Sequence, residues 1–173
     1  MPRSLHAVLV LVMAGVLLVG AAPPTGAAPT PPAPAPSGTY GWPLAGVPTV
    51  TRAFDPPATV YGPGHRGVDL AGAAGDPVLA AGAGVVAFAG SVAGRPVVSV
   101  DHPDGVRTTY EPVQPGVAAG QVVDRGFLLG VLQPGHAGCP AGACLHWGAR
   151  VGEVYLDPLL LLAPPRVRLL PWG

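Results

Sequence analysis

Residues 96–113, PVVSVDHPDGVRTTYEPV, decide the fold class, because apolar and polar residues alternate on both sides of one tight turn. Val98 and Val100 alternate with Ser99 before the turn. Asp104-Gly105 is a dipeptide that forms two-residue turns, and the run from Val106 to Tyr110 follows it. Alternation with a period of two places successive side chains on opposite faces of a strand. The stretch therefore predicts a β-hairpin.

The segments on either side of this hairpin are also short apolar runs broken by glycine, proline and aspartate. Residues 77–92 contain two strand-like pieces around Gly82 and Gly84, and residues 120–132 contain another short pair. Residues 144–151 alternate again, and an apolar run closes the chain. No amphipathic pattern of helical length follows the N-terminal leader. We therefore expect an all-β fold, a compact antiparallel sheet or sandwich of short strands.

The composition agrees with short strands and tight turns. The 173 residues include 26 glycines and 24 prolines, and 49% are hydrophobic while only 10% are charged. Glycine and proline both disfavour helix interiors, so this composition argues against a helical bundle. The length suits one folded domain.

The charges exclude one class of partner. All nine basic residues are arginine, and lysine, isoleucine and asparagine are absent, which indicates a GC-rich bacterial coding bias. Without Arg3 of the leader, eight arginines face nine acidic residues, which leaves a net charge of −1. Because nucleic-acid binding depends on a positive field, we expect no nucleic-acid partner.

The two ends of the chain lie outside the predicted domain. Residues 1–27 have a short basic start, an apolar run and small residues before a cleavage-like site, the pattern of a secretory signal peptide. An uncleaved membrane anchor is the alternative. Residues 28–39 are a Pro/Ala-rich linker, residues 40–162 the folded domain and residues 163–173 a C-terminal tail. We expect a protein secreted into the cell envelope of a bacterium, with no membrane contact after cleavage.

Three side chains have the chemistry of metal ligands. His65 and Asp69 are separated by three residues in a glycine-rich turn before a strand, and His146 lies on the strand-like segment 144–151. Imidazole and carboxylate groups both bind zinc well. A solvent-exposed turn for the first pair and a hydrogen-bonded core position for His146 are the alternatives. Three protein ligands with one open position would form a catalytic rather than a structural zinc site.

Several segments, taken in order, resemble the M23 family of zinc metallopeptidases, the lysostaphin and LytM type. GHRGVDL resembles the His-x-x-x-Asp motif of that family, and GDPVLAAGAGVVAFAG resembles its first hairpin. VVSVDHPDGVRTTYEPV resembles its central hairpin, and CLHW stands where the family has His-x-His. The resemblance implies an antiparallel β fold, a Zn²⁺ ion held by His65, Asp69 and His146, and peptidoglycan peptides as substrates.

The chain departs from the family at two positions. The family has two further histidines near the metal, which position a water and stabilise the oxyanion. The first histidine of His-x-His is Cys144 here. The central Tyr110 is followed by Glu111 and Pro112 instead of Tyr-x-His. The loss of such groups lowers rates by orders of magnitude, so the catalytic groups remain unassigned.

Two residues are candidates to replace the missing histidines. Glu111 would act as a general base if its strand points it toward the metal, and otherwise it is an exposed residue at a strand end. His136, ten residues before His146, would act if its loop folds over the site. For His136 the sequence favours a solvated loop position. His102 is expected at the tip of the central hairpin, away from the metal.

The two cysteines allow two interpretations. In an exported protein, Cys139 and Cys144 can close a small loop as a disulfide, which we favour. Alternatively, the Cys144 thiolate is a fourth ligand beside the three predicted ones, and such a closed site would be structural. These interpretations exclude each other.

The sequence thus predicts an exported, monomeric zinc metalloendopeptidase that remodels the cell wall. The alternative is a catalytically degenerate LytM-type domain that binds zinc and wall peptides or regulates a partner hydrolase.

Overall fold

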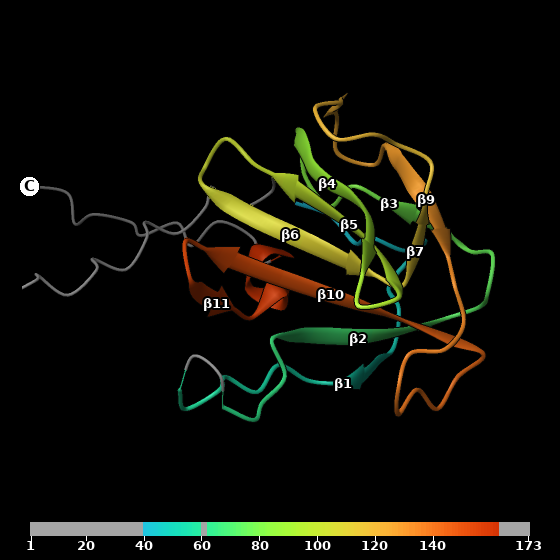
Figure 1. Cartoon of the computed structure of the whole chain (residues 1–173). Helices are drawn as coiled ribbons and strands as arrows, with labels where there is room; N and C mark the ends of the chain where they lie inside the picture. Colours follow the sequence, from blue (N-terminus) through green and yellow to red (C-terminus); the bar gives the residue numbers. More distant parts are fainter. Residues whose placement is uncertain (1–39, 60–61, 163–173) are drawn as a thin grey trace, which may run out of the picture. The chain divides into compact units, whose positions relative to one another are not determined.

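The structure, a computed structural model, describes residues 40–59 and 62–162. These residues form a nearly all-β unit of antiparallel strands with one short 3₁₀ helix, η1, at the end (Figure 1). The elements are β1 (Val50–Arg52), β2 (Gly67–Gly72), β3 (Pro77–Leu79), β4 (Gly84–Val92), β5 (Arg95–Asp101), β6 (Val106–Glu111), β7 (Val113–Pro115), β8 (Val122–Val123), β9 (Leu128–Leu132), β10 (Ala143–Val151), β11 (Val154–Leu156) and η1 (Pro158–Leu162). The predicted all-β fold class is confirmed.

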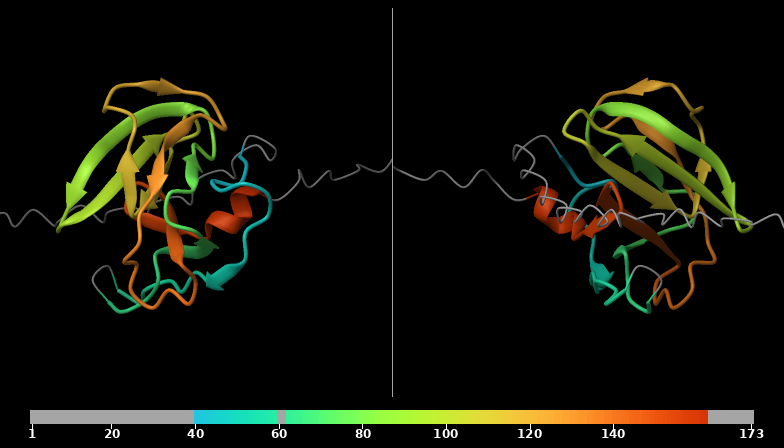
Figure 2. Two further views of the ribbon diagram at one scale, coloured as in Figure 1. Left: turned by 90° about the vertical axis from the view of Figure 1, so that its right-hand side faces the viewer. Right: turned by 60° about the vertical axis from the view of Figure 1, so that its left-hand side comes forward.

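The strands form two sheets. The larger sheet has the order β1-β2-β10-β6-β5-β4-β8, with β11 paired to β10, and the smaller has the order β3-β9-β7. The predicted hairpin at residues 96–113 is β5 and β6. The two short strands predicted within residues 120–132 exist as β8 and β9, but they belong to different sheets. A bulge between Val86 and Phe88 interrupts the β4–β5 register. Bulges bend strands, and the β4–β5 hairpin is strongly arched (Figure 2).

One hydrophobic core joins residues of both sheets. Leu70, Tyr110 and Trp147 of the larger sheet and Leu129 and Leu132 of the smaller are fully buried. On β6, Tyr110 alternates with the more exposed Thr109 and Glu111, as the period of two requires. On β6, Tyr110 therefore faces the core, while Thr109 and Glu111 face outward.

The predicted leader, linker and tail (residues 1–27, 28–39 and 163–173) lie outside the described residues. Among the residues that the structure describes, no helix is long and apolar enough to cross a membrane.

A buried polar chain crosses the core beside the β5–β6 hairpin. The Nδ1 atom of His102 donates a hydrogen bond to the carbonyl oxygen of Ala83 (2.8 Å), and its Nε2 atom lies 2.8 Å from the Thr108 hydroxyl. The Thr108 and Tyr110 hydroxyl groups are 2.8 Å apart, and Tyr110 also accepts the Ala81 N–H. His102 thus lies at the tip of the β5–β6 hairpin and away from the three predicted ligands, as expected, and its side chain is buried.

His102 makes the stability of the fold depend on pH. Burial lowers its pKa below the ordinary 6.5 and outweighs the Ala83 hydrogen bond and the nearby aspartates, which raise it. Below about pH 6.5 the unfolded chain takes up this proton before the folded chain does. The free energy of unfolding is therefore expected to fall as the pH drops through 6.5 toward the lowered folded pKa, and this contribution is constant above that window. Denaturant unfolding from pH 8 to 5 measures it. His102→Gln should remove this part of the slope, and parallel profiles for the two chains would contradict the assignment.

Candidate metal centre

Three side chains converge on the outer face of the larger sheet. Asp69 on β2 and His146 on β10 are direct cross-strand partners, and His65 lies just before β2. Asp69 Oδ1 is 2.9 Å from both His65 Nε2 and His146 Nδ1, and these two nitrogens are 3.0 Å apart. The structure therefore brings together all three residues that were predicted as metal ligands.

Local sequence explains why these side chains meet. On β2, Val68 and Leu70 point into the core and are fully buried, so the intervening Asp69 points to the outer face. His65 is fixed by a backbone pair with Asp55, whose N–H···O distances are 2.7 and 3.0 Å. Glycine at position 64 permits this pair, because a Cβ atom there would lie 2.6 Å from the Asp55 carbonyl oxygen.

The two imidazole rings are held in defined orientations. His65 Nδ1 donates a hydrogen bond to the Ala53 carbonyl oxygen (2.7 Å), so in the neutral ring Nε2 keeps its lone pair for the cluster. The His146 ring lies against Gly67, where a Cβ atom would come within 2.8 Å of its Cε1 and Nε2 atoms. The absent side chain at residue 67 makes room for this ring.

The cluster stabilises the ionised form of Asp69. Burial by itself raises the pKa of the carboxyl group, but the hydrogen bond with His146 and the attraction of the surrounding imidazoles outweigh burial and lower the pKa to about 2. Asp69 is therefore an anion at any physiological pH, as a metal ligand must be.

The donor set fits zinc. Two imidazole nitrogens and one carboxylate oxygen are the ligand types that zinc prefers, with bonds of about 2.0–2.1 Å. A tetrahedral ion with such bonds separates neighbouring ligand atoms by roughly 3.3 Å. The three atoms here are separated by 2.9–3.0 Å, so a shift of a few tenths of an ångström would accommodate the ion.

Cys144 takes no part in this donor set. It forms a disulfide with Cys139, and the Cα atoms of the two cysteines are 5.6 Å apart. A sulfur in a disulfide is not a thiolate, so the closed four-ligand site is not formed in this structure. Three protein ligands with an open fourth position match the catalytic rather than the structural type of zinc site.

His136 lies against the cluster rather than in solvent, contrary to the favoured interpretation of its loop. Its Nε2 atom is 3.1 Å from Asp69 Oδ2, and only 12% of its side chain is exposed. Its ring stacks on that of His146, with centroids 5.8 Å apart and an interplanar angle of 20°. The sequence shows no periodicity in this loop that would have predicted the contact.

Glu111 also lies on the metal-bearing face. It is the β6 residue directly opposite His146, and the core positions of β6 are taken by Thr108 and Tyr110. Its Oε1 atom is 3.0 Å from Arg95 NH1, and 15% of its side chain is exposed. Glu111 thus lies on the face that carries the cluster, with its carboxylate paired to Arg95 of β5.

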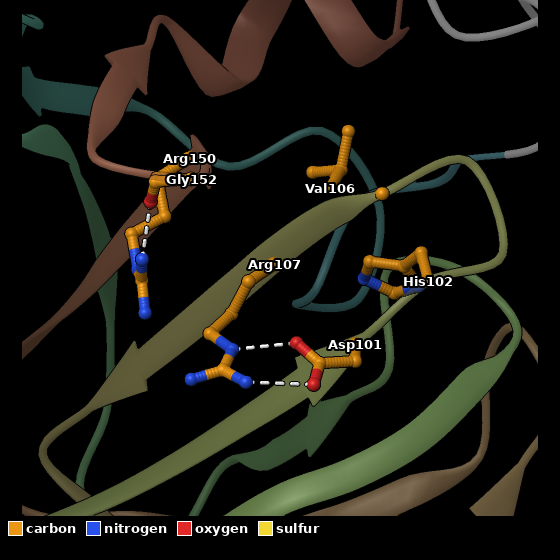
Figure 3. A pocket seen from close by; sticks show the side chains of 7 residues that line it. Asp101, His102, Val106, Arg107, Arg150 and Gly152 are labelled. Atoms are coloured by element: carbon orange, nitrogen blue, oxygen red, sulfur yellow. Dashed lines mark hydrogen bonds and ion pairs between the residues drawn. The ribbon is translucent and has the colours of Figure 1, made fainter.

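A polar pocket lies where β6 begins and β10 ends (Figure 3). Its lining includes Asp101, Val106, Arg107 and Arg150. Arg107 makes two hydrogen bonds to Asp101, of 2.5 and 2.7 Å, and Arg150 bonds the Gly152 carbonyl oxygen. These charges are already partnered within the protein, and the pocket contains none of the metal-site residues.

The described residues thus define an antiparallel β unit with a two-histidine, one-aspartate cluster that suits a metal ion. The profile of Peptidase family M23 matches residues 63–158, so the chain belongs to this family. The match contains all three ligand candidates as well as Glu111 and His136.

Similar proteins agree with this assignment. An uncharacterized protein of Mycobacterium tuberculosis is 53% identical over 144 residues, which cover 81% of this chain and 58% of that protein. The chain therefore spans little more than half the length of this relative. The DD-carboxypeptidase/endopeptidase Mpg of Neisseria meningitidis is 32% identical over 101 residues, which cover 58% of this chain and 23% of that protein.

Solved structures share the fold. The catalytic domain of lysostaphin from Staphylococcus simulans superposes with a TM-score of 0.58 at 23% identity, over 66% of this chain and 92% of that one. Csd3 of Helicobacter pylori gives a TM-score of 0.55 at 25% identity, over 76% of this chain and 38% of that one.

Proposed function

We propose that the chain is an exported zinc metalloendopeptidase that cleaves peptidoglycan peptides in the bacterial cell envelope. The observation that carries this proposal is the convergence of His65, Asp69 and His146 within a family M23 domain. The similarity to a DD-carboxypeptidase/endopeptidase supports the substrate class. The apolar leader supports export.

The protein's own residues would divide the work as follows. Zinc, when bound, would polarise the scissile carbonyl and make a water more acidic. His65 and His146 would hold the metal, and Asp69 would supply the negative charge that keeps it in place. Glu111, whose backbone lies opposite His146, would accept a proton from the attacking water and pass it to the leaving amine.

One observation favours a second function. The two positions where the family has its auxiliary histidines are occupied by Cys144, which is locked in a disulfide, and by Pro112, which follows a cis peptide bond. Neither can move a proton. A degenerate domain that binds zinc and wall peptides, or that regulates a partner hydrolase, would have these same replacements.

Metal removal separates the two functions. The purified chain is expected to contain one zinc ion, and to release new amino termini from isolated peptidoglycan, detected by amine labelling and mass spectrometry. A chelator should lower cleavage to the level of a His146→Ala control, and added zinc should restore it. Bound zinc with cleavage no greater than that of His146→Ala would support the degenerate domain instead. A native chain without metal would contradict both functions.

A further inference from the structure

The loop between β9 and β10, residues 133–142, touches the metal cluster at one point and is bonded to the ligand-bearing strand at another. His136 contacts Asp69 and His146, and Cys139 is joined to Cys144 at the start of β10. Figure 1 shows this loop (orange) near β1, at the end of the larger sheet where β10 begins. The two contacts lie only three residues apart in the loop.

The His136 contact has a defined direction. As a metal ligand, Asp69 would be a carboxylate, which accepts hydrogen bonds and cannot donate them. His136 Nε2 lies 3.1 Å from Asp69 Oδ2, close enough for its N–H to donate to that oxygen, while Oδ1 faces His65 and His146. An outer hydrogen bond of this kind orients a carboxylate ligand, and its loss typically lowers metal affinity about 10- to 100-fold.

The loop has little else to hold His136 in place. It contains no strand or helix, and most of its residues are exposed. Gly135 and Gly138 flank His136 with φ values of 100° and 77°, in the left-handed region that glycine adopts readily. Among the described residues, none between Leu132 and Ala143 belongs to the hydrophobic core. Fixing such a segment is costly in conformational entropy.

The disulfide supplies the missing restraint. Cys144 points to the same face of β10 as His146, two residues away, and Cys139 N–H donates to the His136 carbonyl oxygen (3.3 Å). The bond thus ties a short turn that begins at His136 to the strand that carries a ligand. A covalent link of this kind restricts the conformations open to the loop.

We propose that His136 is a positioning residue of the metal site and that the Cys139–Cys144 disulfide holds it there, so that metal affinity depends on the oxidation of the two cysteines. The inference rests on the metal-binding part of the proposed function and not on peptide hydrolysis. Without the disulfide, His136 would no longer be held against Asp69, and this form of the site would become complete after export, when an oxidant of that compartment removes two electrons and two protons from the thiols.

Metal affinity of the full chain tests this proposal without any activity assay. Zn²⁺ and Co²⁺ dissociation constants are measured by competition with a chelator, together with the visible absorption of bound Co²⁺, which reports on the ligands directly. His136→Ala and the double variant Cys139→Ser/Cys144→Ser are each expected to weaken binding about 10- to 100-fold. Serine is used because a free Cys144 thiolate would itself bind zinc.

Three further results are expected if the disulfide acts through His136. The triple variant should bind no more than about threefold more weakly than either parent, because both changes remove one interaction. His136→Gln, which keeps an N–H donor, should recover part of the affinity and of the Co²⁺ spectrum. Circular dichroism should show the wild-type fold throughout, since the loop contributes no residue to the core.

Other results would contradict particular parts of the proposal. His136→Ala with wild-type affinity and spectrum would overturn the positioning role, and so would a failure of glutamine to rescue. Full affinity in the double serine variant beside a weakened His136→Ala would overturn the role of the disulfide. Tight, disulfide-dependent metal binding without peptidoglycan cleavage would contradict the proposed function and leave this inference standing. A wild-type chain that binds neither ion would overturn both.

Discussion

Asp69→Asn is expected to abolish both zinc binding and peptidoglycan cleavage. Asp69 contacts three histidines. Its Oδ1 atom lies next to His65 and His146, and its Oδ2 atom lies next to His136. Asparagine has the same shape but no negative charge, so it removes the anionic oxygen that a zinc ion would bind. If a binding free energy of about 10–16 kcal/mol is shared among the ligands, losing one costs roughly 3–5 kcal/mol, or about 10²- to 10⁴-fold in affinity.

The measurement is the zinc dissociation constant, followed by the cleavage rate at saturating zinc. Asp124→Asn is the matched control, because Asp124 is an exposed aspartate in the turn before β9. It should retain wild-type zinc content and stability. Because the substitution is isosteric, Asp69→Asn should remain folded. A zinc affinity within about threefold of wild type would show that the ion does not use this carboxylate.

The sequence predicts that His65, Asp69 and His146 come together, and part of this prediction rests on local rules. Alternation around Asp69 and His146 assigns both to the outer face of their strands. The pairing of β2 with β10, which makes the two residues direct neighbours, connects segments more than seventy residues apart. Only the resemblance to a family supplied that pairing. Periodicity alone leaves His146 equally acceptable as a core histidine.

The positions of two histidines could not be predicted from local sequence patterns. His102 follows the last residue of β5 and reads as an exposed turn residue, yet it is buried. Gly82 makes room for it, since a Cβ atom there would lie 3.1 Å from His102 Nδ1. His136 reads as solvated because its loop is polar and rich in glycine. Its position depends on a disulfide to another element, which no pattern within the loop contains.

Position 144, where the family has a histidine, and His136 are connected through the disulfide. Cysteine at position 144 removes a proton-transfer group from β10, but its bond to Cys139 ties down the loop that carries His136. If His136 orients the ligand aspartate as we propose, the loss of a histidine at position 144 and the position of His136 have one structural cause, the disulfide.

Glu111→Gln is expected to leave zinc in place and to lower kcat by about 10²- to 10⁴-fold, the usual contribution of a general base. Residues directly opposite on antiparallel strands have Cβ atoms about 4.5–5.5 Å apart, so Glu111 starts one strand away from the His146 ligand and on the same face. Glutamine keeps the size of the side chain but cannot accept the proton. KM should change little, because the substitution does not remove a metal ligand.

Glu111→Gln also removes the ion pair with Arg95, so its effect on stability must be separated from its effect on kcat. Arg95 holds one carboxylate oxygen of Glu111 at 3.0 Å but is itself 58% exposed, and ion pairs with exposed partners contribute little to stability, about 1 kcal/mol or less. Glu111→Gln should therefore unfold near the wild-type temperature, and Glu153→Gln, at an 87% exposed position near the end of β10, should match wild type in every assay. A kcat within about threefold of wild type for Glu111→Gln would remove the assigned base. Because neither Cys144 nor Pro112 can move a proton, hydrolysis would then have to depend on His136. Glu111 would no longer account for kcat separately from the effect of His136 on zinc affinity.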